Sequence, residues 1–449
     1  MNITFYNKHW FDPAAVAIWD ERATLGRWLE VEVALAEVQA KLGVIPQSAA
    51  EGIAASADVD AFDLDDLAER VGVAQHPFVP FLKLFEDMCP EGAGGWLHWG
   101  ATTQNIFDTT QALQLKATVE LILGRLSSIN DRLARDASRY ASTVQAGRTH
   151  GQHALPISWG YKLAGWLDEM RRNVERLYGL FDHAFVARAG GGAGTYAGMD
   201  GRGREVESAL AIRLGLTAPR LGGRGDFDRQ AEVVGALGML AAGCERIADN
   251  LIFLQRTEIG EVYEDHHAGR VGSSTMAQKR NPAEAQKTAG LARLARSRVS
   301  LALDCMVRDD EGDAVSTNVS DYFLPEFGVL VASCVTALDG LLEQIEVDAD
   351  AMHRNALITG GMMQSEAVMM EVARTRGRGE AHHLLREASA ECLRDGVSFE
   401  QVLASRPQLA GIDVKALLAP ENYLGEVDNV VAALVAEKRP TNGSAAGRG

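Results

Sequence analysis

Between two long helical patterns lies Gly269-Arg270-Val271-Gly272-Ser273-Ser274-Thr275-Met276-Ala277-Gln278-Lys279-Arg280-Asn281-Pro282. Its glycines permit open backbone geometry, its hydroxyl residues offer donors beside free amides, and its basic residues add positive charge. Such a segment suits a carboxylate ligand. A stretch rich in serine and glycine is also typical of a linker, so its meaning depends on the rest of the chain.

The composition of the 449 residues is that of an ordinary globular protein, with 47% hydrophobic and 23% charged residues. This length predicts more than one domain. The first eight residues contain no basic segment followed by an apolar core, so we expect no signal peptide and a cytoplasmic location. The net charge of −17 argues against a nucleic-acid or membrane partner. An anionic substrate therefore needs a local basic pocket.

The five cysteines are scattered, without a C-x-x-C pair, and no histidine lies at metal-ligand spacing from them. We therefore expect neither a disulfide framework nor a metal site.

Helical periodicity dominates the chain, and strong strand alternation appears nowhere. Long apolar patterns run over residues 13–42, 119–140, 158–185, 228–264 and 282–306, and shorter ones over 58–73, 78–88, 379–393 and 427–437. We predict an all-α protein with an N-terminal helical domain (1–105), a central long-helix bundle (106–350), a small C-terminal helical domain (351–438) and a disordered tail (439–449).

Two further polar segments interrupt the helices, at Thr102–Asn105 and at Arg148–His153. Hydroxyls and amides at a helix N-terminus form an anion site, although the first segment also reads as a run of competing N-caps. His76, just before a proline, is by itself typical of a capping histidine. The glycine loop at 189–196 lacks a phosphate-binding motif, so we expect close backbone approach to a ligand or close helix packing there.

From Gly272 to Pro282 the chain resembles, without gaps, the signature loop of the fumarase/aspartase superfamily of β-elimination lyases, with Ala277 where proline is usual. All three polar segments match the superfamily's signature segments in order. The resemblance is closest to adenylosuccinate lyase and 3-carboxy-cis,cis-muconate cycloisomerase. It implies a homotetramer with a twenty-helix core, active sites shared between subunits and no cofactor.

The resemblance also implies residue roles for removing a proton next to a carboxylate, a step that needs a base, donors to the carboxylate and an acid for the leaving group. Ser273 would be the base, with Ser274 as the alternative. His150 would be the general acid, assisted by His76. The substrate carboxylates would be held by Thr102, Thr103, Asn105, Thr149, Gln230, Lys279 and Asn281.

Departures from adenylosuccinate lyase bear on the substrate. Asp321 stands where those enzymes carry a phosphate-holding arginine, and no arginine lies within the first nine residues. A carboxylate repels a phosphate. We therefore expect a small anionic dicarboxylate, an N-substituted aspartate or related substituted succinate, to be split at its C–N bond into fumarate and an amine or similar leaving group.

Three alternatives remain open. One is a cycloisomerase of the carboxymuconate type, since Trp99-Gly100-Ala101-Thr102 resembles that branch as much as the lyases. Another is adenylosuccinate lyase itself, with Arg224 or Arg229 holding the phosphate. The third is a non-catalytic structural protein, against which the retained Ser273 and His150 argue.

Overall fold

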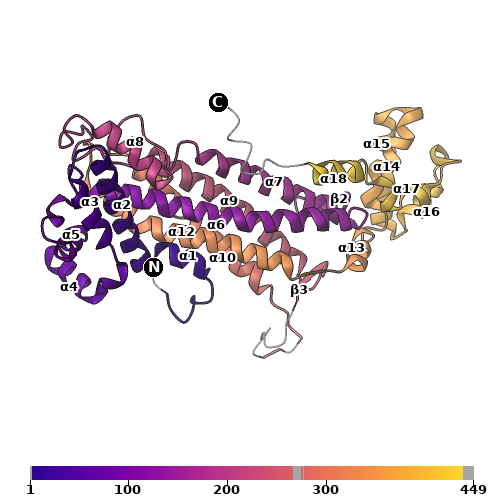
Figure 1. The fold of residues 1–449 in the computed structure, drawn as a ribbon. Coiled ribbons are helices and arrows are strands. Elements are labelled where there is room, and N and C mark those ends of the chain that lie inside the picture. Colours follow the sequence, from indigo (N-terminus) through magenta and orange to yellow (C-terminus); the bar gives the residue numbers. More distant parts are fainter. Residues whose placement is uncertain (1–2, 266–274, 277, 438–449) are drawn as a thin grey trace. The chain divides into compact units, whose positions relative to one another are not determined.

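The structure is a computed structural model that describes residues 3–265, 275–276 and 278–437. Figure 1 shows that the described chain is built almost entirely of helices, which confirms the predicted all-α class. The long helices are α6 (Thr103–Arg139), α7 (Trp159–Leu180), α9 (Asp228–Leu254) and α12 (Ala314–Glu343). Only two small antiparallel sheets occur among the described residues: β1 (Val144–Thr149) with β2 (Gln152–Ser158), and β3 (Val262–Glu264) with β4 (Ile345–Val347).

The chain divides into two compact units. Unit 1 takes in the chain up to Leu126, Arg172–Arg246 and Lys287–Leu338. Unit 2 takes in Ser127–Arg171, Ile247–Gln286 and the chain from Asp339 onward.

Unit 1 begins with a group of helices set by clear capping signals. The Asp12 and Asp20 side chains accept N–H bonds at the starts of α1 (Pro13–Trp19) and α2 (Glu21–Lys41), so the predicted 13–42 helix is broken at Asp20. α2 packs against α3 (Gln47–Ala55) and α8 (Gly203–Leu214). α4 (Leu64–Ala74) packs against α5 (Phe78–Met88). Two short 3-10 helices flank this pair in the sequence: η1 (Val59–Ala61) precedes α4, and η2 (Gly94–Trp96) follows α5.

A buried aromatic cluster holds these helices together. Phe78, Phe81 and Phe85 are fully buried, and Trp28 contacts the first two through ring edges at 5.5 and 5.4 Å. Fully burying one such side chain contributes roughly 2–3 kcal/mol. The core of unit 1 therefore fixes the chain immediately after His76.

α12 is the one described helix long and apolar enough to cross a membrane by length and composition. Most of its apolar window is buried inside the protein, as in the core helix of a globular domain. Pro325 lies inside it.

Unit 2 carries the shorter C-terminal helices, which surround a small core that includes Val368, Leu384, Phe399 and Leu409. They are α13 (Ala349–Ala356), η3 (Met362–Gln364), α14 (Ser365–Arg376), α15 (Arg378–Asp395), α16 (Phe399–Ala404), η4 (Pro407–Leu409), α17 (Val414–Leu417), η5 (Pro420–Tyr423) and α18 (Val427–Ala436). Two further helices, α10 (Ala283–Arg296) and α11 (Val299–Asp304), follow the signature loop.

Candidate active site

The first polar segment is fastened to the glycine loop by Asn105. Its Oδ1 accepts the N–H of Thr102 at 3.1 Å and that of Gly191 at 3.0 Å, and the residue is fully buried. Its Nδ2 has no partner among the described residues. Thr102 and Thr103 remain half-buried at the start of α6. Asn105 thus shapes the turn, while the two threonines stay available for a ligand.

The glycine loop approaches other backbone. A Cβ on Gly190 would lie 2.1 Å from the carbonyl oxygen of Gly222, and one on Gly194 would lie 2.7 Å from the Cα of Gly223. Such approaches exclude any side chain. The loop therefore packs against the backbone of residues 222 and 223, which is not helical, and its predicted approach to a ligand stays a prediction.

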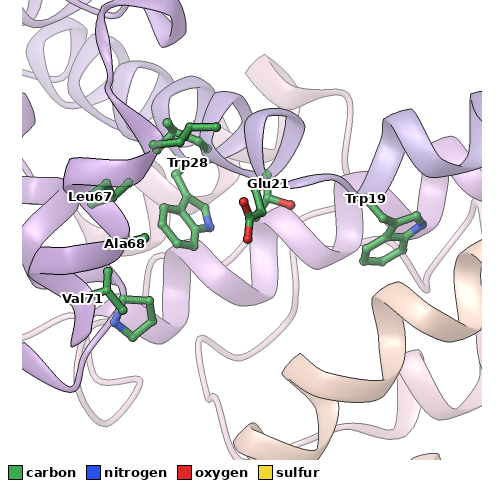
Figure 2. A pocket seen from close by; sticks show the side chains of 10 residues that line it. Trp19, Glu21, Trp28, Leu67, Ala68 and Val71 are labelled. Carbon is green, nitrogen blue, oxygen red and sulfur yellow. The ribbon is translucent and has the colours of Figure 1, made fainter. Parts of the chain in front are cut away.

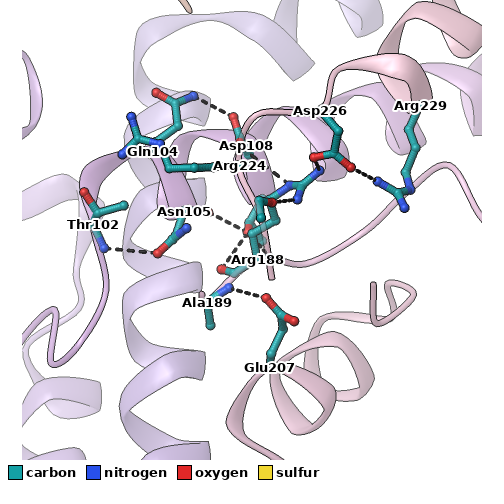
Figure 3. A network of polar contacts seen from close by, with 12 residues as sticks. Thr102, Gln104, Asn105, Asp108, Arg188, Ala189, Glu207, Arg224, Asp226 and Arg229 are labelled. Atoms are coloured by element: carbon teal, nitrogen blue, oxygen red, sulfur yellow. Dashed lines mark hydrogen bonds and ion pairs between the residues drawn. The ribbon is translucent and has the colours of Figure 1, made fainter. Parts of the chain in front are cut away.

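A buried ion-pair network lies beneath this loop (Figure 3). Arg188 is only 1% exposed, bonds Asp226 at 2.5 Å and the carbonyl of Gly223, and lies 3.7 Å from Asp108. Burial raises the pKa of Asp108, and the positive charge of Arg188 opposes that rise. Through Arg188, the network joins Asp108 near the start of α6 to residues 223–226.

His98 is a candidate that sequence reasoning missed. Its ring Nδ1 lies 2.6 Å from Oε1 of the fully buried Glu32 side chain. The backbone N–H of His98 donates to the other carboxylate oxygen of Glu32 at 3.1 Å. Its φ of 57° places it in the left-handed region, rare for a residue other than glycine. It also contacts the Phe78 ring at 5.2 Å. A histidine fixed by a carboxylate suits proton transfer, but Glu32 lies 66 residues away, so no local pattern marked it.

His76 caps α5. Its Nδ1 accepts the N–H groups of Phe78 at 3.2 Å and Val79 at 3.3 Å. The capping interpretation of this histidine therefore fits the structure, and its assisting role in catalysis stays a prediction. Gln230, in the first turn of α9, is buried, and its Oε1 has no partner within the described chain.

The second polar segment is the tip of the β1–β2 hairpin, where a break between helices was expected. Thr149 pairs with Gln152, and the two residues between them, His150 and Gly151, have φ values of 52° and 74°. Positive φ at both positions defines a tight hairpin turn. Thr149 and His150 are exposed at this tip. The strands are short and polar and show no alternation of apolar and polar residues, so the sequence did not predict the hairpin.

Strand β1 of the hairpin is held in place by Glu261, which is fully buried. Its carboxylate binds the guanidinium of Arg148 through both oxygens, and accepts bonds from Gln145 at 2.6 Å and Asn355 at 2.9 Å. Arg148 also lies over the Phe253 ring, 5.5 Å from its centre. Arg148 is therefore a support for the tip.

His153, the second histidine of this segment, is half-buried. Burial lowers its pKa, and the charge of Arg148 lowers it further. Its Nδ1 has no partner in the described part of the chain.

The third segment is described only in part, and Ser273, Ser274 and Ala277 lie outside the described residues. Lys279 is exposed and Asn281 half-buried just before α10. The carboxylate of the buried Glu264 accepts the N–H groups of Glu284 and Ala285, both at 3.0 Å. Glu264 therefore caps α10 and fixes the chain immediately after Asn281.

The predicted residues fall into two groups. His76, Thr102, Thr103, Asn105 and Gln230 belong to unit 1, whereas Thr149, His150, Lys279 and Asn281 belong to unit 2. No group of three or more His, Cys, Asp or Glu side chains suited to a metal ion occurs in the described ranges.

Comparison with known proteins identifies the class. The family model described as Lyase matches residues 10–296, and that described as Adenylosuccinate lyase C-terminus matches residues 361–434. N-acetyl-S-(2-succino)cysteine lyase of Enterococcus italicus is 35% identical over 425 residues, 93% of each chain. 3-Carboxy-cis,cis-muconate cycloisomerase of Acinetobacter baylyi is 32% identical over 431 residues, 94% of this chain and 96% of the relative. The fumarate lyase of Mesorhizobium sp. BNC1 superposes with a TM-score of 0.89 at 30% identity, covering 96% of this chain and 99% of that one.

The chain belongs to the Lyase family, in the adenylosuccinate lyase branch of the fumarase/aspartase superfamily. It is a β-elimination lyase, as the sequence predicted.

Proposed function

We propose that this lyase cleaves a 2-substituted succinate at a C–S or C–N bond, releasing fumarate and a thiol or amine. The structural observation that carries the proposal is the hairpin tip: His150 stands exposed on a turn whose base is fixed by the buried Arg148–Glu261 pair. A proton donor held this way can reach a leaving group. The 35% identity to a lyase of N-acetyl-S-(2-succino)cysteine supports a thioether beside the predicted amine.

The proposed mechanism starts at Ser273, which takes the proton next to a substrate carboxylate. The resulting carbanion is stabilised as a doubly charged carboxylate, so it needs donors and cations around it. Lys279 and Asn281 supply these, together with Thr102, Thr103 and Thr149. The electron pair then forms the double bond of fumarate as the bond to sulfur or nitrogen breaks, and His150 gives its proton to the departing atom.

The site is proposed to be completed in a homotetramer, with segments from different subunits. Support comes from apolar side chains that are exposed on a single chain, notably Met239 on α9 and Leu294 on α10. Exposed apolar side chains on long helices are typical of subunit interfaces. The domain boundaries at 105, 350 and 438, the absence of a cofactor and the cytoplasmic location belong to the same proposal.

The test is a substrate comparison with purified protein. Fumarate absorbance and free thiol or amine are measured with N-acetyl-S-(2-succino)cysteine, a panel of N-substituted aspartates, adenylosuccinate and 3-carboxy-cis,cis-muconate. We expect equal amounts of fumarate and leaving group from one of the first two classes. Efficient turnover of the muconate alone, without fumarate, would make the enzyme a cycloisomerase, and efficient cleavage of adenylosuccinate would return it to purine chemistry.

The leaving group also predicts how much His150 matters. A thiolate, with a thiol pKa of about 8.5, leaves without full protonation, whereas an unprotonated amine leaves with difficulty. His150→Ala should therefore slow a C–N substrate more than a C–S substrate. Equal losses on both would argue that His150 does not protonate the leaving group.

A further inference from the structure

Unit 1 contains a cavity that none of the predicted catalytic or substrate-binding residues lines. It has a volume of about 320 Å³ and lies between α2 and α4 (Figure 2), where the Trp28 ring faces Leu67, Ala68 and Val71. A deeper part of about 170 Å³ reaches α6 and α12. The two parts share Trp19, Thr24, Trp28 and Pro77 as lining residues. The outer part alone is large enough for a small organic molecule.

The deeper part ends in hydrogen-bond acceptors. The side-chain nitrogen of Gln111 donates to Asp321 at 2.7 Å, which leaves the Gln111 oxygen pointing away from that carboxylate. This oxygen and the Thr110 hydroxyl are buried and have no partner among the described residues. Gln111 is only 7% exposed and Thr110 2%. A buried acceptor without a partner destabilises the folded state, so these atoms mark the place of a missing donor.

The charges lining the cavity have one sign. Glu21 lines the outer part and Asp321 the deeper part, and none of the described residues that line either part is Lys, Arg or His. The cavity therefore repels anions and favours a cation.

Aromatic rings complete the walls. Trp28 stacks on Phe107 with ring centres 5.1 Å apart and planes inclined by 18°. The indole N–H of Trp19 donates to the Thr118 hydroxyl at 2.9 Å, which fixes that ring as well. Indole faces attract organic cations through the negative potential of the ring face.

We propose that this cavity binds a primary ammonium group carried on an apolar body. The ammonium would pair with the Asp321 carboxylate, and two further lining residues, Gln111 and Thr110, carry buried oxygens that lack partners among the described residues. The apolar body fills the outer part between Trp28 and Leu67. No side chain in the described part of the chain pairs with the Gln111 oxygen or the Thr110 hydroxyl.

The ammonium has two possible sources. Pro77, on the cavity wall, follows His76, and Phe107 lies about one turn beyond Thr103 on α6, so the cavity is built on the segments that carry predicted substrate residues. The first source is the leaving-group arm of the substrate, and this assignment rests on the proposed function. The second is a separate amine that regulates the enzyme.

The binding test uses calorimetry on the full-length protein with phenethylamine and its neutral counterpart 2-phenylethanol. We expect phenethylamine to bind at least about tenfold more tightly, because a charged donor meets a buried carboxylate. Asp321→Asn keeps the bond from Gln111 and removes the charge, so it should erase this preference. Asp339→Asn is the matched control, since Asp339 accepts a similar bond from Ser128 of α6 at 2.9 Å and lines neither part of the cavity.

Equal binding of the two probes, or an unchanged preference in Asp321→Asn, overturns the proposal. The source is then decided by kinetics, with phenethylamine added during fumarate release. Competitive inhibition assigns the ammonium to the substrate arm, and noncompetitive inhibition assigns it to a separate amine. Because the calorimetry needs no turnover, failure of the proposed function leaves the binding result intact.

Discussion

The hairpin tip and the start of α6 carry predicted substrate residues in opposite ways. At the tip, Thr149 and His150 are exposed, and the buried fixing element is a charged pair, Arg148 with Glu261. At the start of α6, the fixing element is the neutral amide of Asn105, which is itself one of the predicted substrate residues. The comparison teaches that a motif residue such as Asn105 can itself fix the turn that carries its neighbours, while its predicted contact with the substrate stays a prediction.

The largest effect is expected at the tip. His150→Ala should lower kcat by about 10²–10⁴ for an amine-releasing substrate, the usual contribution of a general acid. Its melting temperature should stay unchanged because the side chain is exposed. His153→Gln, three residues along the same hairpin, is the control and should retain most activity. A fully active His150→Ala enzyme would remove the general-acid assignment.

The support of the tip comes next. Arg148→Leu leaves the buried charge of Glu261 without its cation, which should lower the unfolding free energy by roughly 3–5 kcal/mol. Arg135→Leu removes an exposed pair with Asp136 and should cost less than about 1 kcal/mol. Denaturant unfolding of both variants measures the difference. Equal costs would mean that the buried pair does not hold the hairpin.

The α6 side offers a pH test, because Asp321 bonds Gln111 on that helix. Burial raises the pKa of Asp321 to about 6; the nearby Asp108 adds to the rise, and Arg308 and the bond from Gln111 oppose it. The folded state holds the proton of this carboxyl more tightly than the unfolded chain does. The resulting contribution to stability is fully present below about pH 4 and is lost as the pH rises to about 6. At each pH, the unfolding free energy of Asp321→Asn is compared with that of the wild type. This difference should favour the variant by on the order of 2–3 kcal/mol more at pH 8 than at pH 4. A pH-independent difference would show that Asp321 does not titrate in this range.

The smallest effect is expected at Asn105. Asn105→Ala leaves the N–H groups of Thr102 and Gly191 without their acceptor, which should cost about 1–2 kcal/mol of unfolding free energy. KM should rise together with this loss, because the turn that carries Thr102 is loosened. A raised KM with unchanged stability would instead indicate that Asn105 contacts the substrate directly.

Sequence patterns predicted the elements whose signals are local. The predicted helix over 78–88 matches α5 residue for residue, and capping and proline signals placed most other helix ends within a few residues. The patterns over 228–264 and 282–306 were too long, since the first ends in β3 and the second divides into α10 and α11. The β1–β2 hairpin was missed because its short polar strands do not alternate, and because Glu261, which anchors Gln145 and Arg148, lies more than 100 residues away.

The same limit applies to the candidate site. The three polar segments were visible as motifs, since each combines glycine, hydroxyl and amide residues at a helix end. The pairing of His98 with Glu32 and the enclosure of Arg188 by Asp226 and Asp108 join residues from separate elements, which periodicity and capping do not register.

The central claim is that one active site needs residues from different subunits. Mixing His150→Ala with Ser273→Ala under conditions that exchange subunits tests it directly, with fumarate release measured before and after exchange. Each variant alone should be nearly inactive, and the mixed tetramers should regain activity, because some sites then combine an intact Ser273 with an intact His150. Mixed tetramers that form but stay inactive would contradict the shared site.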